Sequence, residues 1–321
     1  MKPKKSITIG MILLLFPLFS PRAAEAGVLG LSLSPSIFEA NIKPGKTITQ
    51  VFTLKNNSAA EQTFVARVIP FTPGDALGNP SLRPNLLPEW LKYFSLSNSD
   101  IKLNEPFVLA ANQSTQLILT INVPGRTGSG DLYSTLLVSS VVKDTPNVSS
   151  TMGAAIGSNL LLTISPLSHP PSLVRISDFA PTKTSFLFRY ADVYLVDSLT
   201  PIYFSATAKN LGKYFVKSAG ALKVEKNGAN VSTQNLLANN ILSNSERVLE
   251  GSPSGQLVYK PSLTSFGNYL VTLDLRNENS SSHAELTTLV LPIKITAVTT
   301  IAILVISSII KVNKKKSDVK K

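Results

Sequence analysis

Apolar and polar residues alternate along several short segments, and this period of two constrains the fold more than any other feature of the chain. In residues 47–55, Ile48, Phe52 and Leu54 fall on one strand face, with Gln50 as the exception. The same alternation recurs in residues 64–68, 117–123, 202–208 and 269–275. A strand of this kind buries only one face, so two sheets must pack face to face to cover both apolar faces. The pattern therefore predicts β-sandwiches.

Turn residues separate these segments, as expected for short antiparallel strands. The clearest turns are Pro44-Gly45, Asn56-Asn57-Ser58, Pro124-Gly125 and Asn227-Gly228. Two adjacent prolines, Pro170 and Pro171, stiffen a linker and stop a ladder from crossing it. We expect an all-β protein with two tandem immunoglobulin-like sandwiches, residues 27–167 and 172–291, joined by a linker at 168–171.

The first 26 residues have the pattern of a secretory signal peptide. Lys2, Lys4 and Lys5 precede an apolar run over residues 7–19, and Ala24-Glu25-Ala26 resembles a cleavage site. We expect cleavage after Ala26. The alternative is an uncleaved N-terminal anchor, although the apolar run is short for a span and contains Pro17.

The C-terminus has the pattern of a single membrane span followed by a basic tail. Residues 295–310 form an uncharged apolar stretch about 24 Å long as a helix, and Lys294 can snorkel to the headgroups. We predict a transmembrane helix at 292–310 and a lysine-rich tail at 311–321. The positive-inside rule places this tail, with Lys311, Lys314, Lys315 and Lys316, in the cytoplasm and both sandwiches outside the cell. The alternative is a last β-strand with a solvated basic tail.

Composition argues against most kinds of catalytic site. The chain has no cysteine and only two histidines, His169 and His283, which argues against thiolate chemistry, most histidine zinc sites and a Ser-His-Asp triad. Ser308 and Lys311 match S-x-x-K but lie at the predicted span. The net charge of +12 lies mostly in the two end segments, so it is weak evidence for nucleic-acid binding. We expect no enzyme activity, no cofactor, no metal and no nucleic-acid partner.

Two stretches are candidates for partner binding. Trp90, Tyr93 and Phe94 are concentrated in residues 83–94, and exposed aromatic rings stack on sugars or anchor proteins. The alternative is that Trp90 packs beneath a loop as part of the sandwich core. Residues 47–53 carry few charges and would accept an added strand at a sheet edge, unless they form an interior strand.

The first domain resembles a known group of bacterial surface domains. Pro44-Gly45 precedes a strand that closes on Lys55-Asn56-Asn57-Ser58, and Glu89-Trp90-Leu91 and Gly130-Asp131-Leu132-Tyr133 continue the pattern. In layout the chain resembles the WxL-interacting, peptidoglycan-associated surface proteins of Gram-positive bacteria. The resemblance implies a peptidoglycan-associated first domain and a second domain that contacts partner surface proteins.

These observations predict a non-catalytic, single-pass membrane protein of the bacterial cell surface that binds cell-wall polymer or another surface protein. An alternative is an envelope accessory or chaperone-like module that acts by β-strand addition. A third hypothesis, an enzyme that uses carboxylates or a serine in a loop cluster, predicts a concave site with convergent polar groups.

Overall fold

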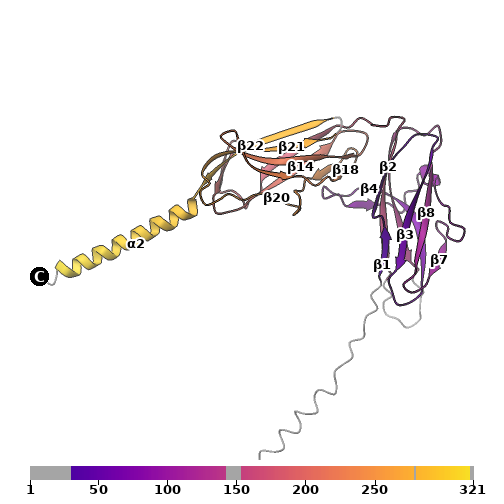
Figure 1. The fold of residues 1–321 in the computed structure, drawn as a ribbon, viewed down its shortest axis with the longest axis horizontal. Helices are drawn as coiled ribbons and strands as arrows, with labels where there is room; N and C mark the ends of the chain where they lie inside the picture. The colour runs from indigo at the N-terminus through magenta and orange to yellow at the C-terminus, as the bar shows by residue number, and fades with distance from the viewer. Residues whose placement is uncertain (1–29, 142–152, 278–279, 319–321) are drawn as a thin grey trace, which may run out of the picture.

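The computed structural model describes residues 30–141, 153–277 and 280–318. The predicted signal peptide at residues 1–26 lies outside this part of the chain. Figure 1 shows two β-rich bodies in a bent arrangement, followed by one long helix. The predicted all-β, sandwich-like architecture is confirmed by four large sheets and one two-stranded sheet, with one long α-helix at the C-terminal end of the described residues.

The first body consists of two sheets. The four-stranded sheet has the order β1 (Leu31–Ser34), β3 (Thr47–Asn56), β8 (Ser114–Asn122) and β6 (Phe94–Leu96). The second sheet has the order β2 (Ile37–Ile42), β10 (Ala155–Ile164), β9 (Gly130–Ser140), β4 (Gln62–Pro73) and β5 (Pro80–Leu82), with β7 (Pro106–Leu109) also paired to β4.

The core between these sheets is built from the alternating apolar residues. Phe52 and Leu54 of β3 are fully buried against Leu117, Leu119 and Ile121 of β8 and against the inner face of the other sheet. Burial of side chains of this size contributes roughly 1.5–3 kcal/mol each. The period of two therefore fixes which face of each strand points inward.

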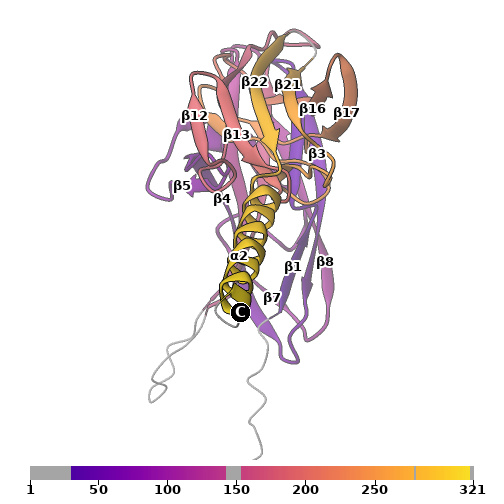
Figure 2. The same ribbon diagram turned by 90° about the vertical axis from the view of Figure 1, so that its left-hand side faces the viewer.

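The second body repeats this plan. One sheet contains β11 (Val174–Pro181), β14 (Ile202–Asn210), β19 (Glu246–Val248) and β20 (Leu257–Tyr259). The other has the order β12 (Phe188–Tyr190), β13 (Val193–Asp197), β22 (Ser281–Leu291), β21 (Gly267–Arg276), β16 (Ala219–Lys226) and β17 (Ala229–Asn235), as Figure 2 shows. A small pair, β15 (Val216–Lys217) and β18 (Asn240–Ile241), completes it.

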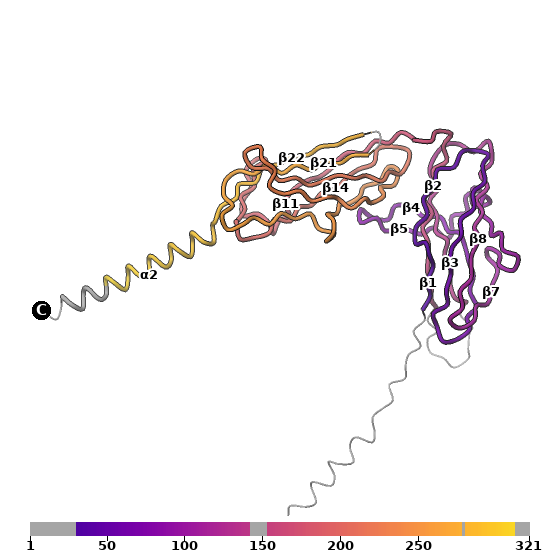
Figure 3. The backbone as a smooth tube through the Cα atoms, viewed as in Figure 1, coloured from indigo at the N-terminus to yellow at the C-terminus, as the bar shows by residue number. Residues whose placement is uncertain are grey.

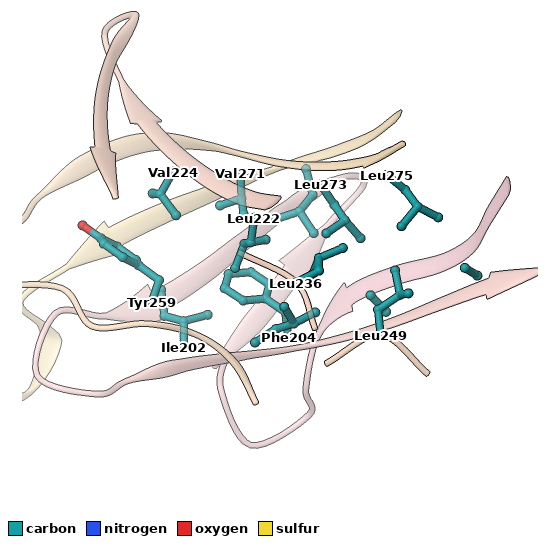
Figure 4. Close-up of a cluster of buried hydrophobic side chains, with 14 of the residues drawn as sticks. Ile202, Phe204, Leu222, Val224, Leu236, Leu249, Tyr259, Val271, Leu273 and Leu275 are labelled. Carbon is teal, nitrogen blue, oxygen red and sulfur yellow. The ribbon is translucent and has the colours of Figure 1, made fainter. Parts of the chain in front are cut away.

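Figure 4 shows the core of the second body, where side chains from both sheets interdigitate. Ile202 and Phe204 from β14 pack toward Leu222, Val271 and Leu273 from the six-stranded sheet. The last strand of the first body ends at Ile164 and the first strand of the second begins at Val174. The predicted linker at 168–171 falls between them.

The helix α2 (Ile293–Asp318) follows β22 after a single residue, Pro292. Figure 3 shows it projecting away from both bodies. Its segment Ile293–Lys311 is long and apolar enough to cross a membrane and is not buried against the protein. The helix continues through Lys314, Lys315 and Lys316, where we expected a separate tail, because residues 311–318 contain no glycine or proline to end it.

Candidate functional site

In each body, the edge strand changes from one sheet to the other. In the first body, β1 pairs antiparallel with β3, and β2 then pairs parallel with β10. In the second, β11 pairs antiparallel with β14, and β13 pairs parallel with β22. When an edge strand pairs first with one sheet and then with the other, it pairs with only part of the neighbouring strand in each sheet. The part of that neighbouring strand without a partner on its outer side is called a half-edge here.

The first half-edge lies on β3. Its residues 53–56 pair with β1, whereas within the described residues 47–52 pair only with β8. Thr47 and Thr49 therefore meet the condition of an edge position among the described residues, whereas Thr53 lies in the interior alternative, paired with Ser34 because β1 extends to that point. Thr47 Oγ1 donates to Asn122 Oδ1 at 3.0 Å, so its side chain already has a partner on β8.

The second half-edge lies on β10. The strand β2 pairs with residues 159–164, and within the described residues Ala155, Ile156, Gly157 and Ser158 pair only with β9. Ser140 N donates to Ala154 O at 2.8 Å, so even-numbered residues of β10 direct their backbone groups toward β9. Odd-numbered residues therefore direct theirs to the other side. Ala155 and Gly157 accordingly offer two N–H and two C=O groups at the edge.

The composition of this half-edge leaves it open to pairing. None of its four residues is charged or proline, the usual features that block an edge strand. A side chain at Gly157 would place its Cβ 2.5 Å from Thr135 Cγ2, so the position accommodates only glycine without movement. Beside it on the outer sheet face lie the half-buried Leu137 and the exposed Arg67, which pair in register.

A cleft of about 300 Å³ lies between the two bodies. It is lined by residues of β2 and β10 and by residues 214–217. At its wall, Glu39 Oε1 accepts hydrogen bonds from Asn240 Nδ2 at 2.5 Å and from Lys217 Nζ at 3.3 Å. The carboxylate of the first body thus holds two groups of the second, which indicates a structural role.

Asp131 makes a second polar contact between the bodies. Its carboxylate accepts hydrogen bonds from Tyr133 Oη, Thr163 Oγ1 and the backbone N–H of Phe215 in the second body. Tyr133 Oη also accepts from Ser243 N at 2.9 Å. Burial raises the pKa of Asp131 above its ordinary value, although the three hydrogen bonds oppose this shift. The network therefore joins the two bodies through Phe215 and Ser243.

The predicted aromatic cluster lies against the core of the first body. Trp90 and Tyr93 belong to a 3₁₀ helix, η2 (Glu89–Tyr93), and Phe94 begins β6. Phe94 is buried, and its ring meets that of Trp90 at a centroid distance of 6.0 Å. Tyr93 Oη lies 3.3 Å from Thr127 Oγ1. The partner-binding role of the three residues stays a prediction.

The predicted topology residues fall at the two ends of the apolar helix segment. Lys294 lies in its first turn, where Nζ is 3.5 Å from Asp197 Oδ2 and donates to Thr200 Oγ1 at 2.7 Å. Lys311 is exposed at the other end. The sidedness that these lysines predict stays a prediction.

No cluster of three or more potential metal-binding residues occurs in the part of the chain that the structure describes. His283 lies between Asp274 and Glu285, with its Nδ1 2.9 Å from Asp274 Oδ1. Lys223 completes this exposed group through an ion pair of 3.0 Å with Asp274. The group joins β16, β21 and β22 on the outer face of their sheet.

Comparisons with known proteins give structural neighbours only. No family model and no curated protein matches the chain. It is similar to the class 5 fimbriae chaperone CfaA, with 11% identity, a TM-score of 0.39, and coverage of 82% of this chain and 100% of that one. It is also similar to a structure of the CsuC–CsuE chaperone–tip adhesion subunit pre-assembly complex of Acinetobacter baumannii, with 11% identity, a TM-score of 0.36, and coverage of 82% and 99%. Likeness of this extent does not say what the present chain binds.

The half-edge on β10 was not predicted from sequence. A usable signal was Pro35, which stands between two short β-prone segments and marks the change of sheet. The edge itself has no sequence signal, because pairing between β2 and β10 joins residues more than 100 positions apart.

Proposed function

We propose that this chain is a non-catalytic, membrane-tethered protein-binding module that takes up a partner by β-strand addition at Ala155–Ser158. The observation that carries this proposal is the free half-edge of β10, uncharged and next to the end of β2. A strand added there would continue the line of β2 along the same sheet. It would pair backbone groups that have no strand partner on that side among the described residues.

Strand addition suits this edge energetically. Backbone hydrogen bonds to Ala155 and Gly157 supply the affinity, and pockets on the sheet face select the partner's side chains. Each net hydrogen bond contributes about 0.5–1.5 kcal/mol. Because Ala155 and Gly157, whose backbone groups face the edge, have a methyl group and no side chain, respectively, a partner backbone can approach without steric hindrance.

The helix α2 supplies the tether in this proposal. Confinement to a membrane raises the effective concentration of partners that share the surface, so a short edge becomes adequate for binding. The exposure of both sandwiches outside the cell and of the lysine tail inside follows from the positive-inside rule. Membership of the WxL-interacting group and binding of wall polymer stay predictions.

The test uses site-specific photo-crosslinking on the full chain in its source organism. A benzoylphenylalanine at Ala155 should form a discrete adduct with an envelope protein, identified by mass spectrometry. The matched control carries the same group at Val108, an exposed residue on the opposite edge strand β7. Ala155→Lys, assayed with the crosslinker at Arg67, should remove the adduct because a lysine obstructs edge pairing.

Two results would count against strand addition. Equal adducts at Ala155 and Val108 would indicate non-specific collision. A crosslink at Arg67 that survives Ala155→Lys would place the partner on the sheet face and not on its edge.

A further inference from the structure

The end of the second body that adjoins α2 is called the base here; it comprises residues 182–188, 197–201, 226–228, 260–267 and 291–294. These segments converge at the last residue of β22. Ser198 N donates to Leu291 O at 2.9 Å, and Gly267 pairs with Val290. Leu199 and Phe266 therefore flank the point where the helix begins, so the base faces whatever surface the helix enters.

The helix is joined to the base without a flexible linker. Asp197 is only 4% exposed, and its Oδ1 accepts the backbone N–H of Lys294 at 3.1 Å. The side chain of Lys294 then binds Asp197 and Thr200. A carboxylate that accepts an N–H group of the first turn also complements the helix dipole. With a single residue, Pro292, between β22 and α2, the base cannot move far from the start of the helix.

Five large apolar side chains are exposed on the base. They are between 43% and 68% exposed: Leu187, Phe188, Leu199, Leu263 and Phe266. Phe188 pairs with Leu195, which pairs with Leu289, so Phe188 lies about 7 Å from the level of Leu291 at ~3.3 Å per residue. Apolar side chains gathered in this way usually contact a partner or a membrane.

The segments of the base also contain four lysines: Lys183, Lys226, Lys260 and Lys294. Lys226 Nζ lies 4.8 Å from the ring centroid of Phe266, a cation–π geometry. Within the described base, the acidic residue is Asp197, which is buried and paired with Lys294. The base therefore combines positive charge with apolar surface, the combination that binds anionic lipid headgroups and the outer acyl boundary.

The outer face of the six-stranded sheet also changes character along its strands. Far from the helix it carries Lys223, Asp274, His283 and Glu285. Near the helix it carries Phe188, Val193, Leu195, Leu270 and Leu289, with Glu225 and Thr287 paired beside Leu270. Figure 2 shows these strands running toward α2. The share of apolar side chains thus increases toward the side where the helix leaves, as expected for a body that stands on a bilayer.

We propose that the base is a lipid-contacting surface that inserts its apolar side chains at the headgroup level of an anionic bilayer. This inference rests on the proposed membrane span of α2. Phe266 and Leu263 reach the acyl boundary, and Lys183, Lys226 and Lys260 contact anionic headgroups. The contact holds the second body at a fixed tilt above the membrane.

The experiment uses the single tryptophan, Trp90, which lies in the other body. In a Trp90→Phe background, Phe266→Trp places a fluorophore on the base while retaining an aromatic ring beside Lys226. The full chain is reconstituted into phosphatidylcholine–phosphatidylglycerol vesicles with bromines on the upper acyl chain. We expect the fluorophore of the Phe266→Trp variant to lose most of its emission and to shift to the blue. Leu263→Trp serves as a second reporter if Phe266→Trp does not fold.

The matched control is Leu211→Trp in the same background, because Leu211 is exposed at the opposite end of the same body, beside Leu173. Its emission should be unaffected by brominated lipid. A chain that floats with the vesicles but shows no quenching at position 266 or 263 would overturn the lipid contact alone. A chain that does not float would overturn the proposed span, and the lipid contact with it, while strand addition at β10 would be judged separately by crosslinking.

The lysine contribution has its own measurement. Quenching at position 266 should fall when phosphatidylglycerol is replaced by phosphatidylcholine, and should fall similarly in a Lys183→Gln, Lys226→Gln, Lys260→Gln variant. Quenching that is indifferent to both changes would overturn the role of the lysines.

Discussion

Asn56 and Asn210 occupy the same place in the two sandwiches, at the ends of β3 and β14. Both are buried. Asn56 Nδ2 donates to the backbone oxygens of Ala60, Leu109 and Ala110, and Asn210 Nδ2 donates to those of Tyr214 and Ile241. Each Oδ1 accepts a backbone N–H two residues later, from Ser58 or Gly212. A single amide therefore ties a turn to neighbouring strands in each body.

Replacing either asparagine should destabilise its own sandwich. Asn56→Ala or Asn210→Ala leaves buried carbonyl groups without donors, and we expect a loss of about 2–3 kcal/mol in the free energy of unfolding. The control is Asn57→Ala, an exposed neighbour whose side chain, among the described residues, donates to Ser32 Oγ. Chemical denaturation of the full chain in detergent gives the values. Losses equal to that of Asn57→Ala would show that the amides are dispensable.

The turns at these asparagines were predictable, but their burial was not. Lys55-Asn56-Asn57-Ser58 and Lys209-Asn210-Leu211-Gly212 are plain turn signals in sequence. The carbonyl groups that they bind include Leu109, Ala110 and Ile241, from distant positions. Because only the fold brings those groups together, the local sequence predicts the turn but not the hydrogen bonds from the asparagine amide to distant carbonyl groups.

His283 should give the second body a pH-dependent stability. Its hydrogen bond with Asp274 raises the pKa of His283, and the same bond, foremost among several, lowers the pKa of Asp274. A raised histidine pKa contributes stability fully below the unfolded value of about 6.5, and this is lost as the pH rises through the folded value. His283→Gln should flatten the decline of Tm above neutral pH.

Because His283 is exposed, this effect on the free energy of unfolding should be small, below about 1 kcal/mol. Thermal melts between about pH 5 and 9 test it, with His169→Gln, the other histidine of the chain, as the matched control. A slope that is unchanged by His283→Gln would contradict the role of His283.

The segment that connects the two sheets through the edge strand has a different length in each body, and the longer segment contains β12. In the first body only Pro35 and Ser36 separate β1 from β2. In the second, residues 182–192 separate β11 from β13 and include β12, with the exposed Phe188 and Tyr190. The insertion covers the edge of β13 and supplies part of the base.

The strands in alternating segments were predictable, whereas the change of sheet and β12 were not. Burial of one face gives Thr47–Asn56 and Gly267–Arg276 a clear period of two. A strand that changes sheets keeps that period in both halves, so alternation does not say where it changes. The three residues of β12 are all exposed and show no alternation.

Asp197 should control how firmly α2 is held to the second body. Burial alone would raise its pKa, but the hydrogen bonds and charge of Lys294 lower it overall, which keeps the carboxylate ionised. Asp197→Ala removes the acceptor for the N–H of Lys294 at a cost of about 1–3 kcal/mol. Hydrogen exchange of the full chain in lipid nanodiscs should show faster exchange at residues 294–296.

Asp192 provides the control for Asp197, because it is a second aspartate next to the same sheet. Asp192 is exposed, and its carboxylate lies 3.8 Å from Arg189. Asp192→Ala should leave exchange at the helix start unchanged. If residues 294–296 exchange hydrogen at the same rate in Asp197→Ala and in the unmodified chain, packing alone holds the start of α2 to the second body.

At the scale of the whole molecule, polar contacts define how the two bodies meet. Asp131 and Glu39 of the first body bind backbone and side-chain groups of the second. In addition, Val248 N donates to Ala76 O at 2.7 Å, which joins the loop between β4 and β5 to β19. Two bodies and a linker were expected from the prolines. The contacts were not, because Asp131 follows Gly130 in a segment that reads simply as the start of a strand.

The Asp131 network should therefore control the distribution of distances between the bodies. Asp131→Ala leaves the N–H of Phe215 without its acceptor and should broaden that distribution, whereas Asp131→Asn keeps an acceptor and should preserve it. Since the chain has no cysteine, Lys102→Cys and Ser254→Cys carry spin labels without background. Double electron–electron resonance then reports the distance.

The pKa of Asp131 predicts a pH dependence of folding stability. Because burial raises that pKa, Asp131 contributes stability fully below the unfolded value of about 3.9, and this contribution is lost as the pH rises through the folded value. The free energy of unfolding should decline over this range in the unmodified chain, and this decline should be absent in Asp131→Asn. The exposed Asp178→Ala should behave like the unmodified chain. A pH response that persists in Asp131→Asn would show that another group is responsible.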